Sequence, residues 1–566
     1  MSAAFDAIVI GAGAGGAAAA WRLTQRGCKV LVLEAGPWFD PDKDYGLAQP
    51  DWETRYFPVK EGSTGRHRFG EMQPLDPQWD DIRSWHHETG RLVVGDRRAV
   101  RGGYSHVRGV GGSTLHYVGE AHRLNPHAMA LHSQYGVGAD WPFDYAELEP
   151  YYLEAERLIG VAGPQETGDR WRSAPYPLPA HPLCRASRTL GEGARAVGLH
   201  WESNPRAALS QAYDGRPPCN YCGGCTRGCP RRDKGSADQT FIRHALQSGR
   251  CEVRARSTVL SLVHGEQRVV RGVRYVDAKG RQCTETARVV ILAAGAIETP
   301  RLLLANRSTL APQGIGNDLG QVGQHFMETL SWTSIGLHPQ AQSSHVGLPA
   351  DAISWDHNRP DAIPGLVGGM RVYAATLDAD LMGPVAYATR LLAGWGARHK
   401  QQLRQTFGHA LAVGAIGESL PHPRAFVDLD PSERDQHGMP LARIHTHVDE
   451  MACRRLQFMA RTCRAVLKAA GCDDLRMELG TYDDFTSTHV FGTCRSGASP
   501  QNSVCNDGNQ IHGWNNLLVC DGSTFPSSGG GESPSLTIQA MALRAVDRFL
   551  QAGKPDVPSL TGRTPS

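Results

Sequence analysis

Four cysteines stand close together near the middle of the chain and are followed at once by a proline, in the spacing CxxCxxCxxxCP. The spacing equals that of the bacterial ferredoxin run, in which thiolates from one looping segment converge on a cubane-type iron–sulfur cluster. Zinc sites normally draw two ligand pairs from separated segments, so the run favours an iron–sulfur cluster over zinc. Because the sequence holds no second run, three or all four thiolates would bind one cluster. The expected ligands are Cys219, Cys222, Cys225 and Cys229.

A glycine-rich turn near the N-terminus has the residue types that bind a dinucleotide. The apolar run 5–10 leads into GAGAGG and then into a row of alanines, so the glycines lie at a strand-to-helix turn. In the GxGxxG spacing, Gly11 makes the tight turn, Gly13 lets a pyrophosphate approach, and Gly16 packs the helix against the strand. Glu34 ends the second strand, where its carboxylate can accept hydrogen bonds from a ribose hydroxyl. The predicted ligand is an adenine dinucleotide, and this unit alone leaves NAD and FAD open.

Length and composition predict a soluble protein of two large domains, since 566 residues are too many for one compact core. The formal net charge of +2 gives no electrostatic reason to expect nucleic acid or a membrane surface as a partner. No apolar run reaches the length of about 18 residues that a membrane span needs. The N-terminus carries no signal peptide or twin-arginine stretch, so we expect a cytoplasmic location, with export to the periplasm beside a signal-bearing partner left open.

Several later segments have the pattern of buried strands and helices seen in the N-terminal unit. Helices are expected over 145–159 and 185–197, and the alternation within 251–275 predicts a β-hairpin. A buried strand over 289–292 runs into AAGA, which predicts a second close approach to the dinucleotide. Near the C-terminus another buried strand ends in Asp-Gly and a helix follows over 535–550.

Residues 331 to about 480 have a different character, with antiparallel strands separated by turns and then a long helix over 449–470. This pattern predicts a separate sheet-and-helix domain inserted into the nucleotide domain. The strands are expected at 331–337, 369–375, 409–416, 425–429 and 441–448.

Six motifs in this order resemble those of the glucose-methanol-choline (GMC) flavoprotein oxidoreductases. They extend from residue 6 to about 550 and comprise GAGAGG with Glu34, GVGGSTLHY, ILAAGAIETPRLLL, GNDLGQVGQHF, STHVFGTCRSG and DGSTFPSSGGGESPSLTIQAMALRAVDRF. Within the family, GGSTLHY and the cysteine run look most like the large subunits of bacterial FAD-dependent sugar and polyol dehydrogenases. Long-chain alcohol oxidases carry similar cysteine runs.

The resemblance implies an α/β fold of the GMC type, in which a Rossmann-like FAD-binding domain holds an inserted α+β substrate domain built on an antiparallel sheet. The discontinuous FAD-binding domain is expected to comprise 1–37, 95–125, 205–330 and 481–566. The substrate-binding domain and its loops are expected to comprise 38–94, 126–204 and 331–480.

FAD is the cofactor that the resemblance implies, and most of its expected contacts follow from the matching motifs. The glycines of the first turn and Glu34 would hold the ADP half, and Val259 and Ala294 would flank the adenine. Two adjacent glycines at 111–112 let the backbone lie against a flat ring. Tyr117 stands where many family members have Asn. The full set is Gly11, Gly13, Gly16, Glu34, Gly112, Ser113, Tyr117, Val259, Ala294, Asp521 and Gly522.

Oxidation of an alcohol removes a hydroxyl proton and a hydride, and flavin N5 can take the hydride while a neutral imidazole takes the proton. His489, in STHVFGT, matches the catalytic histidine of the family. The second active-site residue of the family, a His or Asn, falls here on Ser533. A hydroxyl can hydrogen-bond the substrate oxygen but cannot act as a comparable base. We expect His489 to work with Ser533 alone, and the alternative gives the second polar role to Glu532.

The predicted function is therefore FAD-dependent oxidation of a hydroxyl group of a sugar, polyol or other alcohol, with electrons passed to an acceptor other than NAD. The expected partners are the substrate and a redox carrier or a small or cytochrome subunit. By resemblance, the cysteine run would hold a [3Fe-4S] or [4Fe-4S] cluster, or stay as reduced thiols or a disulfide. The alternatives are an oxygen-using alcohol oxidase of the same fold and a flavin-bearing lyase or isomerase.

Overall fold

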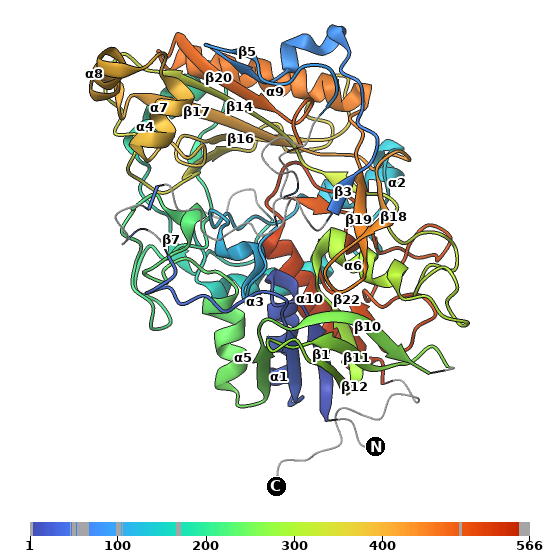
Figure 1. Ribbon diagram of the computed structural model, residues 1–566. Helices are drawn as coiled ribbons and strands as arrows, with labels where there is room; N and C mark the ends of the chain where they lie inside the picture. Colours follow the sequence, from blue (N-terminus) through green and yellow to red (C-terminus); the bar gives the residue numbers. More distant parts are fainter. Residues whose placement is uncertain are drawn as a thin grey trace.

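A computed structural model describes residues 4–45, 47, 52–53, 67–97, 104, 106–165, 171–265, 267–485 and 489–553 of the 566-residue chain. Two large sheets organise these residues (Figure 1). A sheet with parallel strands lies at the bottom of the view, and an antiparallel sheet lies at the top. The mixed α/β class with an antiparallel second sheet confirms the predicted fold.

The parallel strands follow the spatial order β22, β12, β1, β2, β9, so the first strand of the chain lies at the centre. Their side chains are mostly apolar and buried, because both faces of a parallel sheet are normally covered. The strands are β1 (Phe5–Ile10), β2 (Val30–Leu33), β9 (Cys251–Arg254), β12 (Gln282–Leu292) and β22 (Leu517–Val519).

Side chains of β1 alternate between two cores, as the period of a strand requires. Ala7 and Val9 pack with three helices on one face. Ile8 and Ile10 pack on the other face against α6 and the hairpin described next. The helices of the two faces are α1 (Ala14–Gln25), α3 (Tyr145–Ile159), α10 (Ser535–Gln551) and, opposite them, α6 (Gly295–Ala305).

The hairpin predicted within 251–275 differs from the observed pairing at its first strand. β10 (Thr258–His264) and β11 (Val270–Val276) pair with each other, and β11 pairs with the first half of β12. β9 instead pairs in parallel with β2, which lies far away in the sequence. Local alternation cannot reveal such a distant partner, so the first strand was wrongly assigned to the hairpin.

The antiparallel sheet has the strand order β5, β4, β20, β14, β17, β16, β15, β8. Three expected strands are confirmed within one residue at each end: β14 (Leu330–Leu337), β16 (Met370–Ala374) and β17 (Ala410–Gly417). The sequence reading missed β20 because charged residues alternate along it. The remaining strands are β4 (Trp85–His86), β5 (Gly90–Arg91), β8 (Glu202–Ser203), β15 (Ala352–Ser354) and β20 (Asp474–Gly480).

Two helices pack on one face of the antiparallel sheet in a core of buried apolar residues. The long helix α9 (Glu450–Ala469) begins at Asp449, whose side chain accepts a hydrogen bond from the backbone N–H of Ala452. α4 (Arg185–Ala196) packs beside α9. Part of the opposite face packs against α7 (Pro384–Leu391), and the rest lines the cavity described below.

Segment 126–204, expected in the substrate-binding domain, is shared between the two parts. Its helix α3 has the predicted bounds, but the stripe Leu148, Tyr152, Ala155 and Ile159 packs in the core of α1 and α10. α4 packs on the antiparallel sheet as expected. The apolar stripe of α3 predicts a helix but does not indicate which core the helix packs in. The sequence therefore assigned α3 to the other part of the fold.

The strands expected at 425–429 and 441–448 pair with each other but belong to a separate small sheet beside α6. This sheet comprises β18 (Phe426–Arg434), β19 (Pro440–His445) and β3 (His67–Phe69), and β3 runs parallel to β19. Within the described ranges, no helix is both long and apolar enough to cross a membrane.

The shorter elements are η2 (Pro77–Ile82), η4 (Gly112–Leu115), η5 (Pro126–Met129), α2 (Leu131–Tyr135), β6 (Ala162–Gly163), β7 (Leu178–Pro179), η6 (Cys225–Arg227), η7 (Asp238–Ile242), α5 (Arg243–Gln247), β13 (Met327–Glu328), α7 (Pro384–Leu391), α8 (Gly396–Thr406), β21 (Val490–Phe491) and η8 (Gly522–Thr524).

Candidate active site

A cavity of about 1110 Å³ runs from the carboxyl ends of the parallel strands to the face of the antiparallel sheet opposite α4 and α9. At one end it is lined by the residues that follow β1, β2 and β12. At the other end it is lined by side chains of β14, β16 and β17. Ligand sites at the carboxyl edge of parallel strands are a general property of α/β sheets, so this position fits a bound cofactor.

The glycine turn after β1 forms the first end of the cavity. Gly11 has a φ of 101°, which favours glycine, and a Cβ there would overlap the carbonyl oxygen of Ala293. A Cβ on Gly13 would meet only the Cα of Gly112, at 3.8 Å, so the space beside Gly13 is open. Gly16 does not line the cavity, because it packs α1 against the carbonyl oxygen of Gly11. These positions fit the approach and packing roles that the spacing predicts.

Glu34 also lines this end, and its carboxylate is held by backbone N–H groups. Its Oε2 accepts from Ala12 N at 2.9 Å and its Oε1 accepts from Gly36 N at 2.8 Å. Burial raises the pKa of Glu34, and these two donors oppose the shift. The backbone N–H of Gly109 is a third donor to this carboxylate. A carboxylate has about four acceptor positions, so one stays available for a ribose hydroxyl.

The middle of the cavity contains most of the other residues expected at a flavin. Ser113, Tyr117, Val259 and Ala294 line it, and Gly112 lies against Gly13. The Tyr117 hydroxyl donates to the carbonyl oxygen of Gly235 at 2.8 Å, which fixes the ring.

Asp521 and Gly522 line the cavity too, but the Asp521 carboxylate is occupied by the protein. Its Oδ2 accepts from Gly295 N at 2.9 Å and from Thr299 Oγ1 at 2.6 Å. Its Oδ1 accepts from the backbone and hydroxyl of Ser523. The side chain therefore joins the end of β22 to the start of α6, and a ligand at this point meets the backbone of Asp521 and Gly522.

His489 lies where the cavity reaches the antiparallel sheet. Its backbone carbonyl accepts from Thr329 N at 3.1 Å, which anchors the residue next to β21. Burial and the nearby guanidinium of Arg371 lower the pKa of His489 to about 4, against an opposing effect of Glu120. The imidazole is therefore neutral near pH 7 and has one unprotonated ring nitrogen.

Ser533 lines the same part of the cavity and is bonded through both its backbone and its side chain. Its Oγ donates to Glu120 Oε2 at 2.7 Å, and its N–H donates to His122 Nδ1 at 3.0 Å. Glu120 forms a buried ion pair with Arg371, whose Nη2 lies 2.7 Å from Oε2. Burial opposes ionisation of Glu120, but Arg371 outweighs it and holds the pKa of Glu120 well below its usual range.

Glu532 does not face the cavity. Its Oε1 accepts from Asn358 Nδ2 at 2.7 Å and from Asn125 N at 3.2 Å, and none of these three residues lines the cavity. Of the two alternatives for the second polar group, this geometry favours Ser533, whose catalytic role stays a prediction.

The wall formed by the antiparallel sheet carries polar side chains among aliphatic ones, which sequence reasoning missed. Ser331 and Thr333 on β14 line it, and the Tyr373 hydroxyl donates to Asp378 Oδ2 at 2.9 Å. Burial raises the pKa of Asp378. The sequence offers one indication of a polar site here, the charged Arg371 within the apolar run GMRVYA. It does not identify the residue with which Arg371 pairs.

The four cysteines do not line the cavity, although Thr226 and Arg227 of the same loop do. All four are free thiols, and no group of three His, Cys, Asp or Glu residues within the described ranges is arranged to hold a metal. Burial raises the pKa of Cys225 to about 11 and that of Cys229 to about 12; Asp233 adds to the second shift and accepts from Cys229 Sγ. This arrangement does not fit an iron–sulfur cluster, which stays a prediction from sequence.

Known proteins resemble the chain over nearly its whole length. Two models of the family described as GMC oxidoreductase match residues 6–327 and 421–542. The chain is 28% identical to 2-methyl-1,2-propanediol dehydrogenase of Mycolicibacterium austroafricanum, over 96% of this chain and 94% of that protein. It is also 28% identical to the fructose dehydrogenase large subunit of Gluconobacter japonicus, over 96% and 97%.

Among solved structures, pyridoxine 4-oxidase from Mesorbium loti superposes with a TM-score of 0.64 at 18% identity, covering 96% of this chain and 99% of that one. The fold, the glycine turn at the cavity and the match of one family model to more than half of the chain agree with one another. The protein belongs to the GMC oxidoreductase family.

Proposed function

We propose that the protein is an FAD-dependent dehydrogenase that oxidises a hydroxyl group of a sugar, polyol or other alcohol and passes the electrons to an acceptor other than NAD. The observation that carries the proposal is a single cavity in which the glycine turn and Glu34 lie at one end and His489 and Ser533 at the other. GMC oxidoreductases act on CH–OH donors, and a cofactor and a small substrate fit the two ends of this cavity.

The residues around the first part of the cavity fit FAD. The turn at Gly11 and Gly13 offers the N-terminus of α1 to a diphosphate, and no side chain caps that end of the helix in the described structure. Glu34 keeps an acceptor position for a ribose, and Val259 and Ala294 offer an apolar contact. Bound FAD would supply the acceptor for the hydride of the substrate.

His489 is the base in this proposal. Because the imidazole is neutral near pH 7, one ring nitrogen can accept the hydroxyl proton of the substrate as the carbonyl forms. The polar wall at Ser331, Thr333 and Tyr373 suits a substrate with several hydroxyl groups. A site of this kind orients such a substrate by hydrogen bonds and keeps bulk water out of the reacting region.

The electron acceptor is proposed as a redox carrier or partner subunit. Two named relatives are dehydrogenases, and one of these is the large subunit of its enzyme. The basic residues beside the cysteine run give little support for a surface that docks an acidic electron acceptor. Arg232 pairs with Asp42, and Lys234 is buried against backbone carbonyls. The cluster and the cytoplasmic location also stay predictions.

The test is anaerobic addition of a panel of alcohols and sugars to the purified protein, monitored by flavin absorbance and EPR. We expect one or more of these compounds to bleach the flavin, with little oxygen uptake during aerobic turnover until an artificial electron acceptor is added. Rapid oxygen uptake with release of peroxide would identify an oxidase. Turnover of a compound without bleaching would identify a lyase or isomerase. Iron analysis and EPR of the same sample test the cluster.

A further inference from the structure

We propose that Ser533, oriented by Glu120, is an acceptor site for a second hydroxyl group of the substrate, so that the enzyme selects vicinal diols and polyols over simple alcohols. The inference rests on the proposed function and adds the substrate class to it. It depends on the direction of each hydrogen bond around Ser533, which the neighbouring groups determine.

Four hydrogen bonds form a closed ring that begins and ends at Ser533. Its backbone N–H can only donate, so His122 Nδ1 is the acceptor and the ring proton of His122 is on Nε2. His122 Nε2 then donates to Asn204 Oδ1 at 2.7 Å, and Asn204 Nδ2 donates to Glu120 Oε1 at 2.8 Å. Ionised Glu120 can only accept, so the Ser533 hydroxyl donates its one proton to Oε2. The Ser533 oxygen is consequently left as an acceptor, on a residue that lines the cavity.

Glu120 is a poor acceptor for transfer of this proton from Ser533. Each of its oxygens accepts one hydrogen bond from Arg371, and Asn204 and Ser533 supply one more to each oxygen. The carboxylate is thus fully occupied, and the buried guanidinium of Arg371 stabilises its charge. A relay of the substrate proton through Ser533 to Glu120 is therefore unfavourable.

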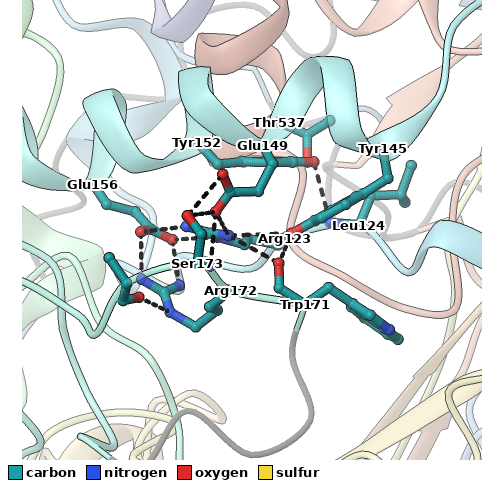
Figure 2. Close-up of polar contacts among 11 residues, drawn as sticks. Arg123, Leu124, Tyr145, Glu149, Tyr152, Glu156, Trp171, Arg172, Ser173 and Thr537 are labelled. Atoms are coloured by element: carbon teal, nitrogen blue, oxygen red, sulfur yellow. Dashed lines mark hydrogen bonds and ion pairs between the residues drawn. The ribbon is translucent and has the colours of Figure 1, made fainter.

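The surrounding structure holds Glu120 and Ser533 in place. Figure 2 shows that Arg123, on the segment that carries Glu120 and His122, is clamped to Glu156 of α3 by two hydrogen bonds of 2.8 and 2.9 Å. Tyr152 of the same helix accepts from Leu124 N at 3.2 Å and bonds Thr537 of α10, just after Ser533, at 2.8 Å (Figure 2). α3 therefore fixes both chain segments that contribute to the ring, the one with Glu120 and the one with Ser533.

A reacting hydroxyl group has one proton, and the proposed chemistry gives it to His489. Nothing on the reacting oxygen is then left to donate to Ser533, yet Ser533 lines the same cavity as His489. A second hydroxyl on the neighbouring carbon supplies the missing donor. A simple alcohol leaves this acceptor without a partner, and an unpartnered polar group costs binding energy.

The first experiment compares propane-1,2-diol with propan-1-ol by anaerobic flavin reduction. In the unaltered enzyme, kcat/KM is expected to favour the diol by about tenfold or more, as expected for the gain of one hydrogen bond. Ser533→Ala should reduce this ratio about tenfold, and Ser533→Thr, which keeps the hydroxyl, should restore most of it. Flavin absorbance and circular dichroism verify that each variant is folded and loaded.

Glu120→Gln reverses the hydrogen bond, because the amide can donate to Ser533 and free the serine proton to point into the cavity. This variant should lose the preference for the diol and gain activity on 2-methoxypropan-1-ol, whose ether oxygen can only accept. If Glu120→Gln fails to fold, the Ser533 variants decide alone.

An unchanged ratio of diol to simple alcohol in Ser533→Ala would overturn the inference, as would equal activity of the unaltered enzyme on both compounds. If the panel's best substrate is another polyol, the same comparison uses that polyol and its analogue lacking the neighbouring hydroxyl. Failure of every alcohol to reduce the flavin would instead contradict the proposed function, so the two failures are distinct.

Discussion

Arg227, on the loop that carries the four cysteines, forms an ion pair with Asp380 at the wall of the cavity, with 3.0 Å between Nη2 and Oδ1. Both residues line the cavity, and Arg390 approaches Asp380 to 4.0 Å. Arg227 also donates to the carbonyl oxygen of Trp52 at 3.1 Å. The cysteine loop therefore shapes the wall of the cavity although its thiols do not line it.

Arg227→Ala should loosen this wall. We expect KM to rise roughly tenfold, since charge-assisted hydrogen bonds at a largely buried guanidinium are lost, while kcat changes little. Steady-state kinetics with an artificial acceptor provide the measurement. Arg232→Ala is the matched control, because Arg232 pairs with exposed Asp42 outside the cavity lining. Equal effects of the two substitutions would argue against a role for the pair in substrate binding.

His489→Ala should reduce the rate of flavin reduction by about 10² to 10⁴ while the flavin stays bound, because the substrate proton loses its acceptor. The pH profile supplies a second test. Since the pKa of His489 is lowered to about 4, the base stays active down to that pH, and kcat/KM should fall only as the pH approaches about 4. A decline centred near the ordinary histidine value of 6.5 would show that the site does not lower the pKa of His489.

Gly16→Ala and Gly13→Ala should have different consequences. A Cβ at position 16 overlaps the carbonyl oxygen of Gly11, so this variant should melt at a lower temperature. A Cβ at position 13 finds open space within the protein, so that variant should keep its melting temperature as the apoprotein and lose flavin. Thermal unfolding of apoprotein and the absorbance of bound flavin separate the two effects. Retention of full flavin by Gly13→Ala would exclude a close approach of the cofactor there.

Glu418 should make the protein less stable as the pH rises toward neutrality. Burial raises its pKa to about 7, with Arg455 opposing the shift and Glu532 adding to it. In the unfolded chain the group ionises near 4.5, so between about 4.5 and 7 the folded state binds more protons and the free energy of unfolding falls with increasing pH. Glu418→Gln should remove this loss. The difference in melting temperature between pH 8 and pH 5 should therefore be less unfavourable to pH 8 in the variant than in the unaltered protein.

Glu433→Gln is the control for that experiment, because Glu433 is exposed on β18 and pairs with Arg68. Its melting temperatures should follow those of the unaltered protein at both pH values. A Glu418→Gln variant with the same pH dependence as the unaltered protein would show that Glu418 ionises normally in the folded state.

The sequence predicted those parts of the fold that depend on local pattern. α3 has the expected bounds, and β14, β16 and β17 lie within one residue of theirs, because hydrophobic period and caps are local properties. β9 was assigned to the wrong pairing and β20 was missed. Their positions depend on neighbours far away in the chain, which periodicity does not reveal.

The candidate site shows the same limit. Motifs placed Gly11, Glu34, His489 and Ser533, and the structure brings these four residues to one cavity. The ion pair behind Ser533 joins residues 120 and 371, which share no motif, and only the fold brings them together. The run of cysteines predicted a cluster from spacing alone, and that cluster stays a prediction, because no group of three ligands within the described ranges is arranged to hold a metal.

β22 and α10 complete the parallel sheet and its helical cover, so the cofactor domain requires residues from both ends of the chain. During synthesis on the ribosome, the N-terminal turn emerges long before these last elements do. A nascent chain therefore exposes an unfinished sheet until translation is nearly complete, and flavin loading must follow release of the C-terminal segment. Truncation just before position 517 would accordingly yield an apoprotein prone to aggregation.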